Sequence, residues 1–191
     1  MRSECEINYI YVFTRAQEKH KWLFHETIGL FYNVAALYLW LFIVAYIIGK
    51  IAGLSVITSD YFMPVLQMYL LNSITMFEFV FIQNILSMKH GGIQAFIITI
   101  FLYAIPVTII SLLYQDFKSK AILYFIIPAN QMYLWHEDRI SNGVVEAFFY
   151  QPIYGFLFFF SLLFLLASIV VTYQIYRAFF IKSDMIELIK E

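Results

Sequence analysis

The feature that most constrains this chain is a run of 23 residues without a charged side chain, from Thr27 to Gly49. About 20 consecutive apolar residues in an α-helix are enough to cross the hydrocarbon core of a bilayer. Because hydrocarbon offers no water to the backbone, such a segment is stable there as a helix that bonds its own peptide groups. Lys50 closes the run. We therefore predict a transmembrane helix over residues 27–49.

Three further stretches have the same character, and Glu78 is the one acidic or basic residue that interrupts them. The expected spans cover about residues 61–88, 93–114 and 150–176. Between the first two of these, Lys89-His90-Gly91-Gly92 predicts a tight turn, because glycine accepts the backbone angles of a reversal. Pro106 removes one backbone hydrogen bond and predicts a kink in the span that contains it.

Composition supports this interpretation, since 62% of the residues are hydrophobic and only 13% are charged. A soluble domain carries about 25% charged residues, so this chain could not cover its surface in water. We predict an all-α fold, a polytopic transmembrane helix bundle with four spans. Residues 1–191 are expected to form a single integral membrane domain, and the lipid bilayer is its first partner.

One apolar segment, residues 121–135, is too short to be a comfortable fifth span. Polar residues lie on both sides of it, and Pro128 near its middle favours a break in any helix. The segment is therefore expected to be either interfacial or re-entrant.

The lysine and arginine residues predict the orientation. With four spans, both tails and the turn at Lys89 share one side. That side holds eight basic residues: Arg2, Arg15, Lys19, Lys21, Lys89, Arg177, Lys182 and Lys190. The other side holds four: Lys50, Lys118, Lys120 and Arg139. The positive-inside rule then places both termini in the cytoplasm or the mitochondrial matrix. A fifth span would remove this bias.

The second span carries the polar groups that are candidates for chemistry. At 100° per residue they share an arc of about 160°. They are Gln67, Asn72, Thr75, Glu78 and Gln83. An ionisable side chain at membrane depth is costly and usually faces protein or a water-filled cavity. Glu78 is therefore a candidate proton or cation site. The alternative is that it hydrogen-bonds a neighbouring helix and fixes the packing.

Other polar groups favour simpler roles. His136-Glu137-Asp138-Arg139 combines a base, two acids and an arginine, but no second histidine lies at ligand spacing. We interpret this group as a loop that is solvated or lies at headgroup level. The single cysteine, Cys5, excludes a thiolate zinc site, and all four histidines lie at span ends, which argues against haem. No metal and no cofactor are predicted.

A basic cluster precedes the first span and consists of Arg15, Lys19 and Lys21. These residues are candidates for binding lipid headgroups, so bound phospholipids are an expected partner. The alternative is that they only mark the topology. A net charge of −1 gives no field that would attract nucleic acid.

The function predicted first is a non-catalytic subunit of a larger membrane complex of the respiratory-chain or ATP-synthase type. Other integral membrane subunits are then its partners. The chain has 28 isoleucines and 21 phenylalanines against 21 leucines, a bias typical of AT-rich genomes. The first 27 residues lack the apolar core of a signal peptide and carry four glutamates, too many for a transit peptide. A mitochondrial inner membrane, with the gene in the organelle, and a bacterial plasma membrane both fit.

The alternative function is transport, by a small permease or channel subunit with its polar site around Glu78. Pro106 and the segment 121–135 are consistent with it, because broken helices often line substrate sites. An enzyme is the least favoured class. The sequence contains no phosphate-binding glycine loop, no HExxH and no GxSxG. We expect no catalytic residue in this chain.

Overall fold

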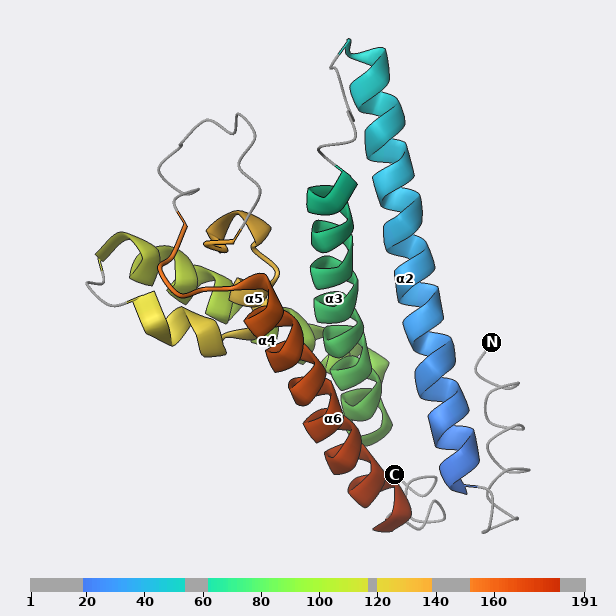
Figure 1. The fold of residues 1–191 in the computed structure, drawn as a ribbon. Helices are drawn as coiled ribbons and strands as arrows, with labels where there is room; N and C mark the ends of the chain where they lie inside the picture. Colours follow the sequence, from blue (N-terminus) through green and yellow to red (C-terminus); the bar gives the residue numbers. More distant parts are fainter. Residues whose placement is uncertain (1–18, 54–61, 117–119, 139–151, 183–191) are drawn as a thin grey trace.

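The computed structural model describes residues 19–53, 62–116, 120–138 and 152–182 (Figure 1). These residues form helices and connecting turns, with no strand among them. The four long helices are α2 (Lys19–Ile51), α3 (Phe62–His90), α4 (Gly92–Asp116) and α6 (Phe158–Lys182). Each is long and apolar enough to cross a membrane. The predicted all-α bundle with four spans is therefore confirmed.

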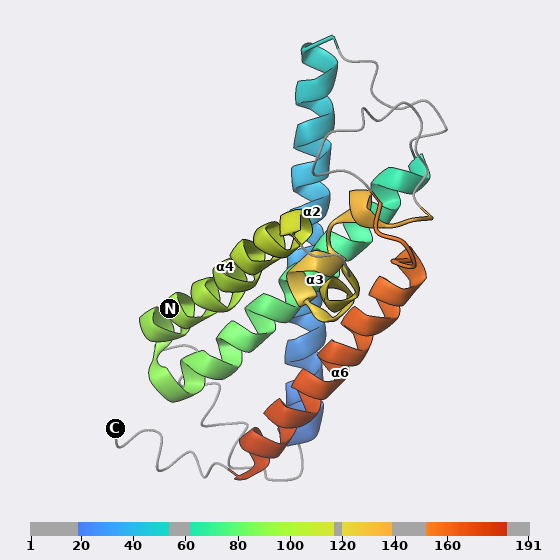
Figure 2. The ribbon, with the colours of Figure 1, turned by 90° about the vertical axis from the view of Figure 1, so that its left-hand side faces the viewer.

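The ends of the long helices lie in two groups (Figures 1 and 2). The start of α2, the turn between α3 and α4, and the end of α6 lie together at the lower end of the molecule. The end of α2 lies at the opposite end, α3 begins somewhat lower, and α6 begins lower still, near mid-height. Four alternating spans require this grouping when the first and last helical ends share one side.

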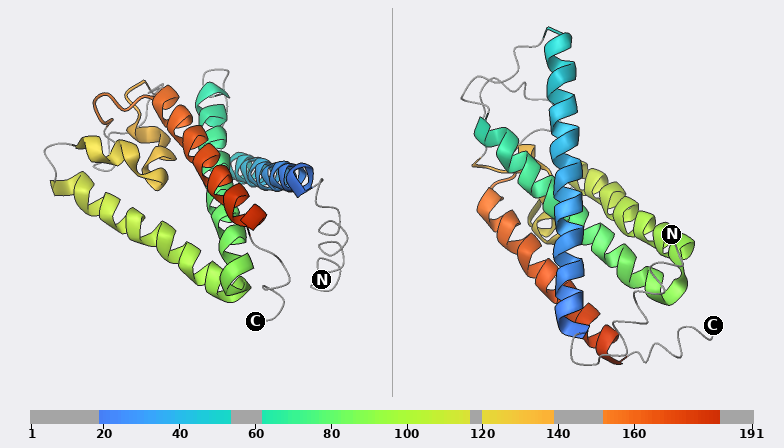
Figure 3. Two further views of the ribbon diagram at one scale, coloured as in Figure 1. Left: turned by 90° about the horizontal axis from the view of Figure 1, so that it is seen from below. Right: turned by 90° about the vertical axis from the view of Figure 1, so that its right-hand side faces the viewer.

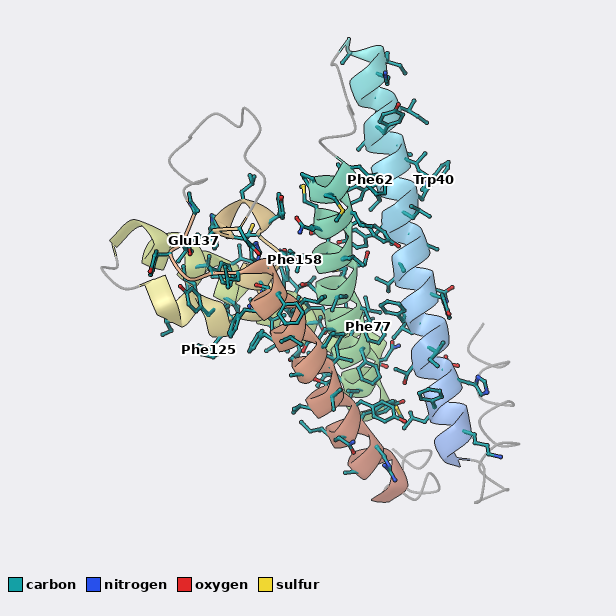
Figure 4. All side chains as sticks on the ribbon, in the orientation of Figure 1. Trp40, Phe62, Phe77, Phe125, Glu137 and Phe158 are labelled. Carbon is teal, nitrogen blue, oxygen red and sulfur yellow. The ribbon has the colours of Figure 1, made fainter. Side chains whose placement is uncertain are left out.

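Helix α3 is the centre of the bundle. It packs against α2, α4 and α6, and it lies between α4 and α6 in Figure 2. In its most apolar window, 44% of the residues are buried, whereas the figure for α2 is 6%. The outer helices instead expose large apolar side chains such as Trp40, Phe101 and Val171, and Figure 4 shows Trp40 directed away from the other helices. Lipid tails suit such surfaces.

The turn between α3 and α4 agrees with the prediction from the paired glycines. Helix α3 ends at His90, α4 begins at Gly92, and Gly91 between them has φ of +81°. A side chain is rarely tolerated at that angle, so glycine is needed there. Pro106 lies inside α4, which continues on both sides of it; the predicted kink stays a prediction.

The start of the last helix differs from the sequence prediction. Helix α6 begins at Phe158, eight residues after the expected start of the span at residue 150. Residues 152–157 are not helical, and Gly155 has φ of +78° in a turn. The backbone of this stretch bonds to another part of the chain: the Ile153 N–H donates to the Trp135 carbonyl, and the Glu137 N–H donates to the Phe156 carbonyl. Residues 152–157 therefore form these contacts in place of the helical turns that the sequence predicted there.

The apolar segment before α6 breaks into three short helices. They are η2 (Lys120–Phe125), α5 (Ile127–Asn130) and η3 (Tyr133–Trp135). Helix α5 packs against α3, α4 and α6, and its Pro128, Ala129 and Asn130 are buried. In Figure 3 the segment fills the wide end of the gap between α4 and α6. It does not form a fifth span within the described residues.

The grouping of helix ends predicts that His90 and Ala52, which are both exposed, lie on opposite sides of the membrane. Single-cysteine variants His90→Cys and Ala52→Cys, made in a Cys5→Ser background, should therefore react with a membrane-impermeant maleimide from opposite sides of sealed vesicles. Trp40→Cys is the control, because lipid should shield that position from both sides. Labelling of His90→Cys and Ala52→Cys from the same side of the vesicles would contradict the topology.

Candidate functional site

The site centres on Glu78, in the middle of α3. Its side chain is completely buried. Between residues 62 and 88 of α3 it is the one acidic or basic residue. The Ser168 hydroxyl on α6 donates a hydrogen bond to Oε1 of Glu78. The two residues are 90 positions apart in the chain. The carboxyl group of Glu78 therefore links α3 to α6.

The surroundings of Glu78 along α3 are apolar. Toward the start of α3, Leu71 and Ile74 pack with Leu165 and with Tyr133 of η3. Toward its end, Phe77 and Phe81 stack with ring centroids 5.6 Å apart, and the Tyr176 ring meets Phe81 edge-on at 5.4 Å. No ion pair involves Glu78 in the described part of the chain.

Two buried oxygens of this site have no hydrogen-bond partner. They are Oε2 of Glu78 and Oγ1 of Thr75, one turn earlier on α3. Other helical threonines of this chain behave differently: Thr27 and Thr99 each donate to the carbonyl four residues before them. Thr75 is completely buried and leaves its hydroxyl free.

The five polar residues predicted on one face of α3 have different fates. Thr75 and Glu78 are buried one turn apart. Asn72 donates to the Met68 carbonyl of its own helix at 2.7 Å, so its amide serves the backbone. Gln67 and Gln83 are half-buried, and Oε1 of Gln67 lacks a partner. The structure therefore concentrates the site on Glu78, with Thr75 beside it.

The sequence analysis missed Ser168, which holds the carboxyl group. A lone serine in an apolar helix is common and carries no signal by itself. Spacing could have found it: Ser161 and Ser168 are seven residues apart, which places both hydroxyls on one face of α6. Ser161 is completely buried.

A second buried polar group, His136, lies at the end of η3. Its Nδ1 is 3.0 Å from the Tyr133 carbonyl, and its Nε2 is 2.8 Å from Oγ of Ser161. A carbonyl can only accept, so Nδ1 carries the proton and Nε2 accepts from the serine. The imidazole also stacks on the Phe156 ring, with centroids 4.6 Å apart. His136 is fully buried, so a solvated loop does not describe this side chain, whereas a position at headgroup level stays a prediction.

The two acids after His136 stay exposed and bind backbone N–H groups near the start of α6. Oε2 of Glu137 accepts from the Gly155 N–H at 2.7 Å, and Oδ1 of Asp138 accepts from the Phe158 N–H at 3.0 Å. Figure 4 shows Glu137 and Phe158 at this end of α6. Asp138 thus caps α6 from a distant segment, where a negative charge also favours the helix dipole. Arg139 lies outside the described residues.

The basic residues predicted to bind lipid headgroups lie at or before the start of α2. Lys21 is exposed near the start of α2. Lys19 is the first residue of α2, but its side chain, like all of Arg15, lies outside what the structure describes. Among the described residues, no three His, Cys, Asp or Glu side chains come close enough to hold a metal ion. No family model, curated protein or solved structure matches this chain.

Burial of the imidazole makes the stability of this end of the bundle depend on pH. Burial lowers the pKa of His136 below its ordinary value of 6.5. The unfolded chain then binds a proton near pH 6.5, whereas the folded chain binds it only at lower pH. The contribution to stability is therefore complete above about pH 6.5 and is lost as the pH falls below it.

We predict that the midpoint of thermal unfolding in detergent falls as the pH drops below about 6.5, and that His136→Gln removes part of this fall. His90→Gln is the matched control, because His90 is exposed and should leave the profile unchanged. An identical pH profile in wild type and His136→Gln would contradict the burial of this histidine.

Proposed function

We propose that this chain is a non-catalytic, membrane-embedded subunit of a larger energy-transducing assembly of the respiratory-chain or ATP-synthase type. The observation that carries the proposal is the large apolar surface of α2 that its own chain leaves uncovered. Only 6% of its most apolar window is buried. Its 33 residues span about 50 Å at 1.5 Å per residue, against a hydrocarbon core of about 30 Å.

Helix α2 packs mainly against α3, and its Leu23 and Val34 are buried in a cluster with Phe77 and Phe81. The Tyr69 hydroxyl of α3 donates to the Ala35 carbonyl at 3.0 Å, and Phe31 meets Phe77 edge-on at 5.4 Å. Lipid tails are as apolar as leucine, so burial of apolar surface does not drive helices together in a membrane. A long span that leaves most of its apolar surface uncovered in its own chain is well suited to contacts with neighbouring subunits.

The same proposal includes the membrane in which the protein lies. The excess of isoleucine and phenylalanine is consistent with an AT-rich genome, either of a mitochondrion or of a low-GC bacterium. The eight basic residues against four favour termini in the matrix or cytoplasm. The membrane is then the mitochondrial inner membrane or the bacterial plasma membrane.

A second candidate function is transport, as a small permease or channel subunit. The unpartnered Oε2 of Glu78 and Oγ1 of Thr75 favour it, because buried polar groups in membrane helices often belong to a substrate or ion pathway. The short helices between α4 and α6 also favour it, since interrupted helices often form such sites.

Native gels of membranes solubilised in mild detergent distinguish these functions. We predict that the chain comigrates with respiratory-chain or ATP-synthase subunits, identified by mass spectrometry. Comigration with a nucleotide-binding ATPase would support the transport function instead. A chain that runs alone as a monomer in the mildest detergents would contradict the proposed assembly.

A further inference from the structure

Glu78 lies deep in its helix. It is 16 residues after Phe62 and 12 before His90, which correspond to about 24 Å and 18 Å along the axis. A carboxylate at such depth loses its hydration, which is costly unless partners compensate. Ser168 supplies one hydrogen bond, and no basic side chain in the described part of the chain supplies a charge. The neutral carboxylic acid is therefore the form that this environment favours.

Only one carboxyl oxygen of Glu78 has a partner. Oε1 bonds the Ser168 hydroxyl, a group that can both donate and accept. Oε2 is buried and has no hydrogen-bond partner. The Thr75 hydroxyl, one turn away on the same helix, is in the same condition. Side chains at i and i+3 are neighbours, with about 5–6 Å between Cβ atoms.

Two buried oxygens without a partner thus lie one turn apart, although a buried polar group is costly to leave unsatisfied. Thr75 could satisfy its hydroxyl on its own helix, as Thr27 and Thr99 do, and it does not. A third hydrogen-bonding group that reached both oxygens would satisfy them. A proton carrier, such as a water molecule, is a group of this kind.

We propose that Glu78, Ser168 and Thr75 form an exchangeable proton site inside the membrane, in which Oε2 of Glu78 takes up and releases the proton. Ser168 orients the carboxyl group through Oε1, and Thr75 provides the second contact for the group that delivers the proton. This inference goes beyond the proposed function and does not depend on it, since a subunit and a transporter could each use such a site.

The other titratable groups on elements packed against α3 do not determine the charge of Glu78. They are mostly phenols, which stay neutral at physiological pH. They are Tyr38 of α2, Tyr103 of α4, Tyr133 of η3, and Tyr173 and Tyr176 of α6, together with His136. His136 bonds Ser161, which lies two turns before Ser168 on α6, and the completely buried Leu165 lies between these serines. An apolar layer therefore separates the two titratable sites.

Infrared difference spectroscopy of the full chain in lipid vesicles tests the site. The spectrum of wild type minus Glu78→Gln should contain the C=O band of one carboxylic acid. That band should shift on transfer into D2O, because the acid proton exchanges. Thr75→Val should slow this exchange about fivefold, since one hydrogen bond to the carrier is lost. The control Glu137→Gln removes an exposed carboxyl group and should leave the band unchanged.

Each other result overturns the proposal. A carboxylate band in place of the acid band would show that Glu78 is charged. An acid band that never shifts in D2O would show a closed, structural acid. Replacement of the acid band by a carboxylate band on adding sodium chloride would assign the site to sodium. If Glu78→Gln fails to fold, Ser168→Ala assigns the band instead, because loss of the hydrogen bond at Oε1 moves the C=O frequency.

Discussion

Every peptide group inside hydrocarbon must find its hydrogen-bond partner within the protein, and this constraint determines most of the structure. It requires helices wherever the chain crosses the membrane. It also explains the contrast between α3 and the other spans. Apolar side chains can face lipid on α2, α4 and α6, whereas the polar groups of α3 need protein around them. The helix with Glu78 therefore lies at the centre, and 44% of its most apolar window is buried.

The same constraint explains how α6 is placed. Ser168 bonds the carboxyl group of Glu78, and Ser161 bonds the imidazole of His136. These two hydroxyls lie on one face of α6, with Leu165 buried between them. One end of α6 is capped by Asp138. Polar contacts thus link α6 to both α3 and the short helices before it, and apolar contacts around Leu165 pack between these links.

The spans could be predicted because they depend on local properties of the sequence. A charge-free run long enough to cross a bilayer and a glycine turn at Gly91 are visible without any tertiary contact. The start of α6 could not be predicted, because residues 152–157 pair with residues 135–137 of a distant segment. For the same reason, the burial of His136 and the role of Ser168 were missed. Glu78 was identified because an ionisable residue in an apolar span is conspicuous. Its partner Ser168 depends on how α6 packs against α3, which the sequence does not show.

A hydrogen bond between Glu78 and Ser168 joins α3 to α6, and a double-mutant cycle measures its contribution directly. The unfolding free energies of wild type, Glu78→Leu, Ser168→Ala and the double variant in bilayer-like micelles give the coupling. Interhelical hydrogen bonds in membranes contribute about 0.6 kcal/mol on average and up to about 1.7, and we expect a coupling in the upper half of this range because the pair is buried. Ser87→Ala replaces Ser168→Ala in the control cycle, since the Ser87 hydroxyl bonds its own helix at Asn84, and it should give no coupling to Glu78. A coupling at Ser168 that is equally close to zero would contradict the account.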